Sequence, residues 1–302
     1  MAIQQTWIVK IGFMSLSFLS ECKAKVLNRI DALLLDTNKI VSAMRYSALA
    51  DSKCIRAGLV FASGKLNKEI SNSALIDMAT SIELMHTYSL IHDDLPSMDN
   101  DDMRRGQASN HIQYNEATAI LAGDALQALA YETLASSLDI TPAQKICSIK
   151  ALANACGHEG MILGQQYDLD AEKNEYNDIK KIHELKTGKL IQAAMTMPHL
   201  GDEKQKNQLM ILDEVGKDLG LAFQIMDDVL ETSADSSILG KSNQSDLINK
   251  KLTYVSAYGK QESIAQAHAL SNACISKLEN SLDNNEVVSL LELAKFMVER
   301  EN

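Results

Sequence analysis

Residues 92–106 read HDDLPSMDNDDMRRG, in which five aspartates fall within ten positions and two arginines follow directly. The apolar run from Leu84 to Ile91 leads into this stretch, so the acids are expected to end a buried helix. Crowded carboxylates repel one another and resist full ionisation unless a cation neutralises them. Magnesium suits such a site, because it binds one or two carboxylates together with water and substrate phosphates. The adjacent arginines suit a polyanion that the metal also holds.

A second stretch of the same design lies downstream, where the apolar run 220–226 leads into Asp227, Asp228 and Glu231. Asp227 and Glu231 are four residues apart, so a helix places both on one face. Either motif alone is equally typical of a helix end with solvated acids. Together, and with the basic residues below, they predict two acid-tipped helices that face each other across a cavity and hold magnesium and diphosphate.

The composition predicts one large domain over residues 1–302. Hydrophobic residues make up 46% of the chain, and no segment rich in proline, glycine or serine marks a boundary. The net charge of −11, without a long basic stripe, argues against nucleic acid as a partner. The cysteines form no CxxC pair and no disulfide framework, which favours a reducing cytoplasm.

The apolar segment from Trp7 to Leu19 is too short to span a bilayer, and Lys10 interrupts it. It has no clear small-residue cleavage site. We therefore favour a first helix that packs on a partner subunit over a signal peptide, and expect no stable membrane insertion.

Helix-forming residues dominate and strict apolar–polar alternation is scarce, which predicts an all-α bundle of ten or more helices around a deep central cavity. Thr141 and Gln144 form a capping-box pattern, and Asn177 and Asp202 are expected N-caps. Small residues in the stretch 122–125 would allow close helix packing. The predicted helices cover residues 22–50, 54–66, 72–95, 112–137, 142–167, 177–198, 203–231, 252–258, 261–281 and 284–299.

Basic and polar residues elsewhere predict a second diphosphate site. Lys53 and Arg56 share a helix face, and His86 lies two helical turns before the first acids. The stretch 186–188 (KTG) supplies donors and a glycine for close approach, and Lys241 follows the second acid pair. Each of these residues alone is more typical of a solvated surface or, for the histidine, of a structural hydrogen bond. Their combination with the acids carries the prediction.

With these motifs the chain resembles the trans-isoprenyl diphosphate synthases, and within them the bacterial farnesyl diphosphate synthases (geranyltranstransferases). The resemblance runs from about Met44 to Tyr254. The stretches that carry it are YSLIHDDLPSMD at 88–99, RRG at 104–106, AILAGDAL at 119–126, KTG at 186–188 and FQIMDD at 223–228. It implies the isoprenoid synthase fold, a homodimer, and about three magnesium ions bound with the allylic diphosphate.

The resemblance also implies roles by matching position. The implied magnesium ligands are Asp93, Asp94, Asp99, Asp227 and Glu231. The implied diphosphate contacts are Arg104 for the allylic substrate and Lys53, Arg56, His86 and Arg105 for isopentenyl diphosphate. The residues implied to line the allylic side and to stabilise the departing diphosphate or the developing cation are Lys186, Thr187, Gln224 and Lys241.

The implied reaction condenses isopentenyl diphosphate head to tail with dimethylallyl or geranyl diphosphate to give farnesyl diphosphate. Magnesium and basic side chains neutralise the departing diphosphate, an allylic cation forms, the double bond attacks it, and a proton is lost. Tyr88 lies about 7.5 Å deeper than Asp93 along a helix, so its ring is expected to floor the cavity and limit product length. Ser89 is too small to do so. A geranylgeranyl diphosphate synthase is the alternative.

Several positions depart from the family pattern. The family usually reads GGKRxRP where this chain reads DSKCIRA at 51–57, so Asp51 replaces a glycine and Cys54 an arginine. The loss of a charged hydrogen bond, about 1.5–3 kcal/mol, is expected to weaken isopentenyl diphosphate binding about ten- to a hundredfold. Glu231 and Asn100 stand where the family usually has aspartate.

Two other classes of function are weighed against this one. The departures are compatible with a weak or non-catalytic subunit that binds prenyl diphosphates. A class I terpene cyclase shares the first acidic motif, but its second motif, NDxxSxxxE, is not found in the sequence. The pair Lys53 and Arg56 would also have no role in a cyclase.

Overall fold

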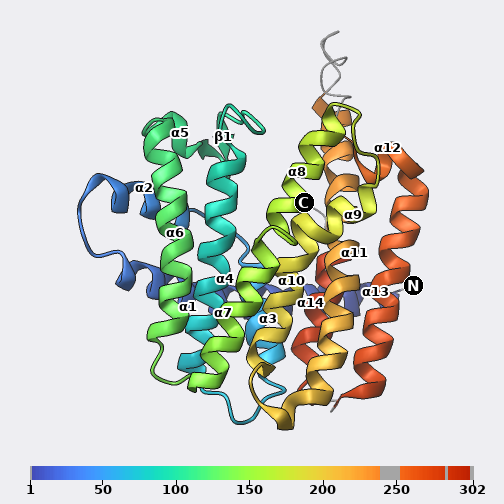
Figure 1. The fold of residues 1–302 in the computed structure, drawn as a ribbon. Helices are drawn as coiled ribbons and strands as arrows, with labels where there is room; N and C mark the ends of the chain where they lie inside the picture. The colour runs from blue at the N-terminus through green and yellow to red at the C-terminus, as the bar shows by residue number, and fades with distance from the viewer. Residues whose placement is uncertain (1, 239–251, 283–284, 300–302) are drawn as a thin grey trace. The chain divides into compact units, whose positions relative to one another are not determined.

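The computed structural model describes residues 2–238, 252–282 and 285–299, and these are almost entirely helical (Figure 1). The chain divides into two compact units. The first consists of Met1–Leu152 and Met197–Lys206, and the second of Ala153–Thr196 and Asn207–Asn302. The all-α prediction is confirmed, while the single domain stays a prediction.

The first unit contains most of the N-terminal half. Its helices are α1 (Ala2–Leu33), α2 (Lys39–Ala48), α3 (Ile55–Gly64), α4 (Asn72–Asp93), α5 (Asn110–Gln113), α6 (Glu116–Ser136), most of α7 (Pro142–Cys156) and the 3₁₀ turns η2 (Met197–His199) and η3 (Glu203–Gln205). A short hairpin, β1 (Met103–Arg104) and β2 (Gln107–Ala108), follows α4.

The second unit contains the second acidic motif. Its elements are α8 (Met161–Glu172), α9 (Ile179–His183), the π-helical turn η1 (Glu184–Gly188), α10 (Lys189–Thr196), α11 (Lys206–Ile238), α12 (Tyr254–Tyr258), α13 (Lys260–Ser281) and α14 (Val288–Glu299).

Helix α4 is the centre of the first unit and packs against α6, α3 and α1 (Figure 1). It is apolar on nearly every face, which explains its central place. A Cβ atom on Gly123 of α6 would lie 2.2 Å from Nε2 of His92, so the ring of His92 on α4 packs directly against this glycine and would have to move for any larger residue. The close packing predicted at residues 122–125 is therefore confirmed.

In the second unit, α11 packs with α9, α12 and α13 around an apolar core that includes Ile182, Leu221, Ile225 and Val229. The π-helical turn lies against α11. A Cβ atom on Gly220 would come within 2.7 Å of the Cα of Gly188, so the backbones touch at this point.

The predicted helices 22–50 and 142–167 are each broken, and the predicted helix 112–137 runs across the break between α5 and α6, so these predictions are wrong in this respect. The first is interrupted between α1 and α2, where the side chain of Asn38 accepts a hydrogen bond from Val41 N at 2.9 Å and starts a new helix. The second is interrupted between α7 and α8 by a turn that Gly157 and Gly160 bound.

The predicted helix caps are mostly confirmed. Thr141 N donates to Gln144 Oε1 at 3.1 Å, and Gln144 N donates back to Thr141 Oγ1 at 3.3 Å. Asp202 caps η3 through Lys204 N at 2.9 Å. The cap of α9 is Asp178 and not Asn177, since the Asp178 carboxylate is the group that accepts from the third residue along.

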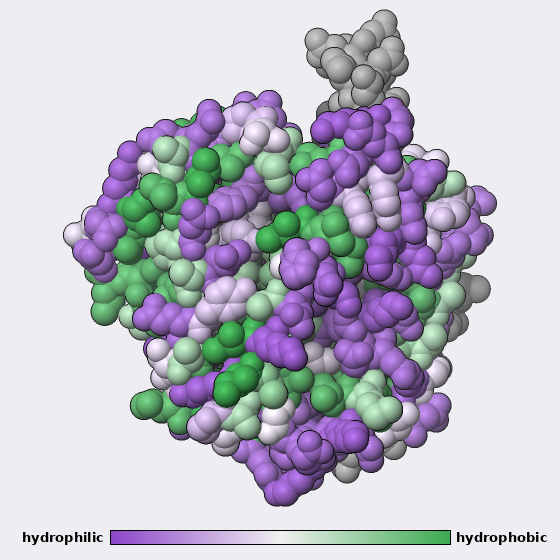
Figure 2. Space-filling model, viewed as in Figure 1, coloured by the Kyte–Doolittle hydropathy of each residue, from purple (hydrophilic) through white to green (hydrophobic). Residues whose placement is uncertain are grey.

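Among the described helices, none is both long enough and apolar enough to traverse a lipid bilayer. On the face shown in Figure 2, hydrophobic side chains gather over the region of α5 and α6. Ile112, Ile120 and Leu121 are the large exposed apolar residues of these two helices.

Candidate functional site

The first acidic motif folds back on the end of α4. The N–H of Asp99 donates to the carbonyl of Asp93 at 2.8 Å, and the N–H of Asp101 donates to the carbonyl of Asp94 at 3.2 Å. Asn100 adopts a left-handed φ of 53°, which asparagine tolerates better than most residues. The turn therefore brings the backbones of Asp93 and Asp99 together, although they are six positions apart.

Asp94 is held by Arg104 of the hairpin. Its side chain is almost fully buried, and Arg104 Nε donates to Asp94 Oδ1 at 2.8 Å, with Nη2 contacting the same oxygen. Nη2 also donates to Asp101 Oδ2 at 3.0 Å. Burial raises the pKa of Asp94, and the hydrogen bonds and charge of Arg104 oppose that rise. Asp94 thus positions the arginine, and its role as a metal ligand stays a prediction.

The two arginines stand on a tight β-hairpin that was not predicted. Arg104 pairs with Gln107, and the turn between them consists of Arg105 with φ 53° and Gly106 with φ 76°. Positive φ at both central residues is the geometry of a type I′ turn, which matches the twist of the two strands. The turn places Arg105 at the hairpin tip, where it is half-buried.

Positive charge surrounds His86 of α4. Arg56 Nη1 lies 3.2 Å from His86 Nε2. Burial holds the pKa of His86 well below 6.5, and the charges of Arg56, Arg105 and Arg104 lower it further. His86 is therefore neutral at neutral pH, and its Nε2 accepts a hydrogen bond from Arg56. Four of the five predicted diphosphate contacts thus meet within the first unit.

Glu83 supports this cluster and was not predicted. Its Oε1 accepts a hydrogen bond from Ala57 N in the first turn of α3 at 2.9 Å. Burial raises the pKa of Glu83, and the charge of Arg56 opposes the rise. Glu83 lies three residues before His86, so the helical period could have identified it as a neighbour on the same face.

The loop before α3 carries the fifth predicted contact, Lys53, which is exposed. Lys23 of α1 forms an ion pair with Asp51 of this loop. Cys54 adopts a left-handed φ of 47°, and its Sγ lies 3.1 Å from Ser52 Oγ. Burial raises the pKa of Cys54 to about 12, so its thiol is uncharged at neutral pH.

A small hollow lies between α2, α4 and the hairpin. Tyr46, Asp94, Arg104 and Arg105 are among the residues that line it. The two arginines therefore lie at the edge of the same hollow.

The predicted chain-length residues occupy different surroundings on α4. Tyr88 is only 5% exposed, and its ring meets that of His92 edge to face, with centroids 5.4 Å apart. Ser89 is half-buried, and its Oγ donates to the carbonyl of His86 at 2.9 Å. A buried aromatic ring upstream of the first acids is compatible with the floor role, which stays a prediction.

In the second unit, Lys186 and Thr187 lie on the π-helical turn η1. A π turn widens the helix locally and often occurs at functional sites. Lys186 Nζ donates to Asp168 Oδ2 at 2.7 Å, and Thr187 Oγ1 donates to Gln224 Oε1 at 2.7 Å. Three predicted residues are thereby placed, and Asp168, a buried acid on α8, was missed.

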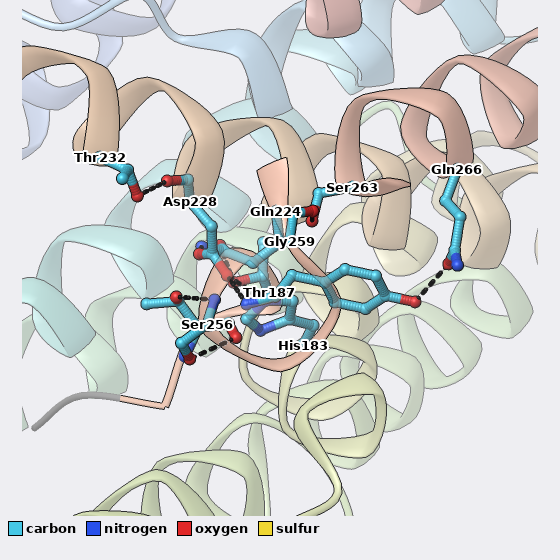
Figure 3. Close-up of polar contacts among 11 residues, drawn as sticks. His183, Thr187, Gln224, Asp228, Thr232, Ser256, Gly259, Ser263 and Gln266 are labelled. Atoms are coloured by element: carbon cyan, nitrogen blue, oxygen red, sulfur yellow. Dashed lines mark hydrogen bonds and ion pairs between the residues drawn. The ribbon is translucent and has the colours of Figure 1, made fainter. Parts of the chain in front are cut away.

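Asp228 is the centre of a buried hydrogen-bond network (Figure 3). Its Oδ2 accepts from Tyr254 N at 2.6 Å and lies 2.8 Å from His183 Nε2, while its Oδ1 accepts from Gln224 Nε2 at 3.3 Å. The network joins α9, α11 and α12 and extends through Gln224 to Thr187. Neither His183 nor Tyr254 was predicted.

The second set of predicted metal ligands lies on α11, where Asp227 is half-buried and Glu231 is exposed. Lys241 lies outside the described residues. Within the part of the chain that the structure describes, no three histidine, cysteine or acidic side chains are grouped as a metal site. Magnesium needs fewer protein ligands than that, because phosphate and water complete its shell. The carboxylate oxygens of Asp93, Asp99 and Asp227 are of the type that it prefers.

Comparisons with known proteins agree on one family. Residues 37–292 match the family model described as polyprenyl synthetase. The farnesyl diphosphate synthase of Escherichia coli is 38% identical over 277 residues, which cover 90% of this chain and 92% of that protein. Geranylgeranyl diphosphate synthases are also similar, including that of Cyanophora paradoxa, at 38% identity over 97% of this chain and 99% of that protein.

Solved structures of the same kind share the fold. A geranyltransferase from Legionella pneumophila superposes with a TM-score of 0.80 and is 34% identical, over 95% of this chain and 97% of that one. A Helicobacter pylori geranyltransferase, complexed with magnesium and isoprenyl diphosphate, has a TM-score of 0.77 and is 29% identical, over 95% of this chain and 98% of that one.

Proposed function

The chain belongs to the polyprenyl synthetase family, and we propose that it condenses isopentenyl diphosphate with an allylic diphosphate to give farnesyl diphosphate. The charge pattern of the first unit carries this proposal. Asp93 acts electrostatically on Arg104, and Arg104 is one of three arginines around the neutral His86. Acids for a metal and bases for phosphate are needed side by side when the substrate is a metal-bound polyanion.

The proposed magnesium ligands are Asp93, Asp94, Asp99, Asp227 and Glu231, and about three ions are expected to bind with the allylic diphosphate. Asp94 also holds Arg104. The donor set consists of carboxylate oxygens, which match a hard cation. When bound, magnesium neutralises charge on the departing diphosphate.

In the proposed reaction, the allylic C–O bond breaks and its electron pair leaves with the diphosphate, whose charge Arg104 and Lys186 stabilise. The hydroxyl of Thr187 donates a hydrogen bond to Oε1 of Gln224, so the lone pairs of the hydroxyl oxygen are proposed to face the developing cation. The double bond of isopentenyl diphosphate attacks that cation and forms the new C–C bond. The proton lost from the isopentenyl unit passes to the released diphosphate. Lys241 is proposed to stabilise the same diphosphate.

Isopentenyl diphosphate is proposed to bind Lys53, Arg56, His86 and Arg105. His86 takes part as a neutral imidazole, so the positive charge comes from the arginines and the lysine. The ring of Tyr88 is proposed to stop the growing chain at fifteen carbons, as the floor of the cavity. Geranylgeranyl diphosphate is the alternative product, since synthases of that product are similar to the chain over nearly its whole length.

The protein is proposed to act as a homodimer in the cytoplasm. The exposed side chains of Ile112, Ile120 and Leu121 give α5 and α6 an apolar face that a second copy could cover. The cysteines among the described residues are free thiols, as is usual in a reducing compartment. Light scattering of the purified protein measures the oligomeric state.

Turnover by the purified protein tests the proposed function. With isopentenyl diphosphate, dimethylallyl or geranyl diphosphate, and magnesium, we expect pyrophosphate release and a fifteen-carbon product by chromatography. Chelation of the metal by EDTA is expected to abolish both. Binding of the substrates without turnover would instead indicate a non-catalytic subunit, and a twenty-carbon product would indicate a geranylgeranyl diphosphate synthase.

A further inference from the structure

The loop before α3 has a charge balance that is poorly suited to a diphosphate. Asp51 places a negative charge two residues before Lys53, which is proposed to bind isopentenyl diphosphate. Cys54 contributes no charge at neutral pH, because burial raises the pKa of its thiol to about 12, whereas an arginine at this position would be positive. This loop alone should therefore repel a diphosphate more than a loop with glycine at position 51 and arginine at position 54.

Lys23 of α1 supplies the opposite charge. Its Nζ forms an ion pair with Oδ1 of Asp51, 28 residues further along the chain. The hydrogen bond from Lys23, followed by its charge, lowers the pKa of Asp51, so this carboxylate stays ionised at neutral pH. The Asp51 side chain is 91% exposed and that of Lys23 only 27%, so the lysine is the better-packed partner and restrains the loop.

The charge of Lys23 acts on this loop together with that of Arg105, which is a proposed diphosphate contact. Both charges, that of Lys23 and that of Arg105 at the hairpin tip, act on Asp51 and on Cys54. Coulomb interactions of this kind are screened beyond about 10 Å. The ammonium of Lys23 and the guanidinium of Arg105 therefore border the same loop, within the first unit.

We propose that Lys23 is a positioning residue for isopentenyl diphosphate: it neutralises Asp51 and holds the loop so that Lys53 can bind the diphosphate. It thereby offsets the negative charge that distinguishes this loop from one with glycine at position 51. This inference rests on the proposed function, since it concerns the same substrate.

Steady-state kinetics of four proteins test the proposal: the wild type, Lys23→Ala, Asp51→Gly and the double variant. Lys23→Ala is expected to raise KM for isopentenyl diphosphate about five- to tenfold, because Asp51 is left unpaired beside the substrate. KM for the allylic diphosphate and kcat are expected to change less than about twofold. The double variant should recover a KM within about threefold of the wild type, since the repulsive carboxylate is gone.

Two further variants separate charge from packing. Lys23→Arg keeps the positive charge and should restore a KM close to that of the wild type. Lys25→Ala removes the same charge from the same helix, where the ammonium lies over the ring of Phe61 with 5.3 Å to the centroid. It should leave KM for isopentenyl diphosphate unchanged. The effect of Lys23→Ala should also shrink at high salt, which a packing defect would not do.

An unchanged KM for isopentenyl diphosphate in Lys23→Ala would overturn the proposal. A double variant with a KM as high as that of Lys23→Ala would also overturn it, because Lys23 would then bind the substrate directly. Calorimetric titration with isopentenyl diphosphate gives the same comparison without turnover. If the wild type binds this substrate but does not turn it over, the proposed reaction fails while the dissociation constants of the variants still decide the role of Lys23. If the wild type does not bind it, both proposals fail.

Discussion

The aspartate pairs of α4 and α11 have the same sequence form but different supports. In each pair the second acid is buried, Asp94 at the end of α4 and Asp228 within α11. Neighbouring residues of a helix point about 100° apart, so burial of the second acid turns the first toward another face. Asp93 and Asp227 are accordingly half-buried.

The supports differ in charge and in distance along the chain. Asp94 is held by Arg104, a permanent cation ten residues away on the hairpin that follows. Asp228 is held by a histidine 45 residues before it and by a backbone N–H 26 residues after it. The first anchor is therefore a local feature of one stretch of sequence, whereas the second exists only once three helices of the second unit have packed.

Asp228→Ala is expected to have the largest effect on stability and should lower the free energy of unfolding by about 3–5 kcal/mol. It leaves His183 and the N–H of Tyr254 without their buried acceptor. Asp94→Ala is the matched variant and should cost only about 1.5–3 kcal/mol, because Arg104 keeps a second acid and is partly exposed. Urea unfolding measures both. Equal losses would show that the two anchors do not differ as described.

Asp93→Asn and Asp227→Asn are expected to act on catalysis, with kcat about 100- to 1000-fold lower for each. Asparagine keeps the shape of the side chain but removes the charge proposed to bind magnesium. The free energy of unfolding should change by less than about 1 kcal/mol, which contrasts with Asp228→Ala. If either variant unfolds as easily as Asp228→Ala, the division between ligand and anchor is wrong for that pair.

The same contrast explains what could be predicted from the sequence. The acids and arginines of residues 92–106 were identified because they lie in one stretch, and the structure places them together. His183 and Lys23 were not predicted, because each meets its aspartate only through packing between segments that are distant along the chain. Single-sequence periodicity gives the face of a helix but not the neighbour of that face.

The helix boundaries were predicted wrongly for a different reason. The break between α1 and α2 depends on side chains that compete with the helix: Asp36 accepts from Thr37 N at 2.7 Å and from Asn38 Nδ2 at 2.7 Å. Such local hydrogen bonds favour a turn and a new cap over helix continuation. The residues DTN at 36–38 favour such a turn, but the helix-forming residues on both sides led to the prediction of one continuous helix.

The residues upstream of the two pairs offer a test of product length. Tyr88 precedes Asp93 by five positions and Phe223 precedes Asp227 by four, and both rings are buried. Tyr88→Ala is expected to shift the main product from fifteen to twenty carbons, because the floor of the cavity is removed. Phe223→Ala should leave the product length unchanged. Chromatography of the products decides, and a fifteen-carbon product from both variants would refute the floor assignment.

The smallest expected effect is a pH dependence of the free energy of unfolding, caused by His86 of α4. Burial and three arginines hold the pKa of His86 well below 6.5. Below about pH 6.5 the unfolded chain takes up a proton there that the folded chain does not, so the free energy of unfolding falls as the pH drops toward the lowered pKa. The slope is at most about 1.4 kcal/mol per pH unit.

His86→Gln should remove this slope, as measured by urea unfolding from about pH 7.5 to about pH 5. Burial also lowers the pKa of His199, but that residue is present in both proteins and its contribution cancels in the difference. Parallel profiles for the wild type and His86→Gln would contradict the assignment.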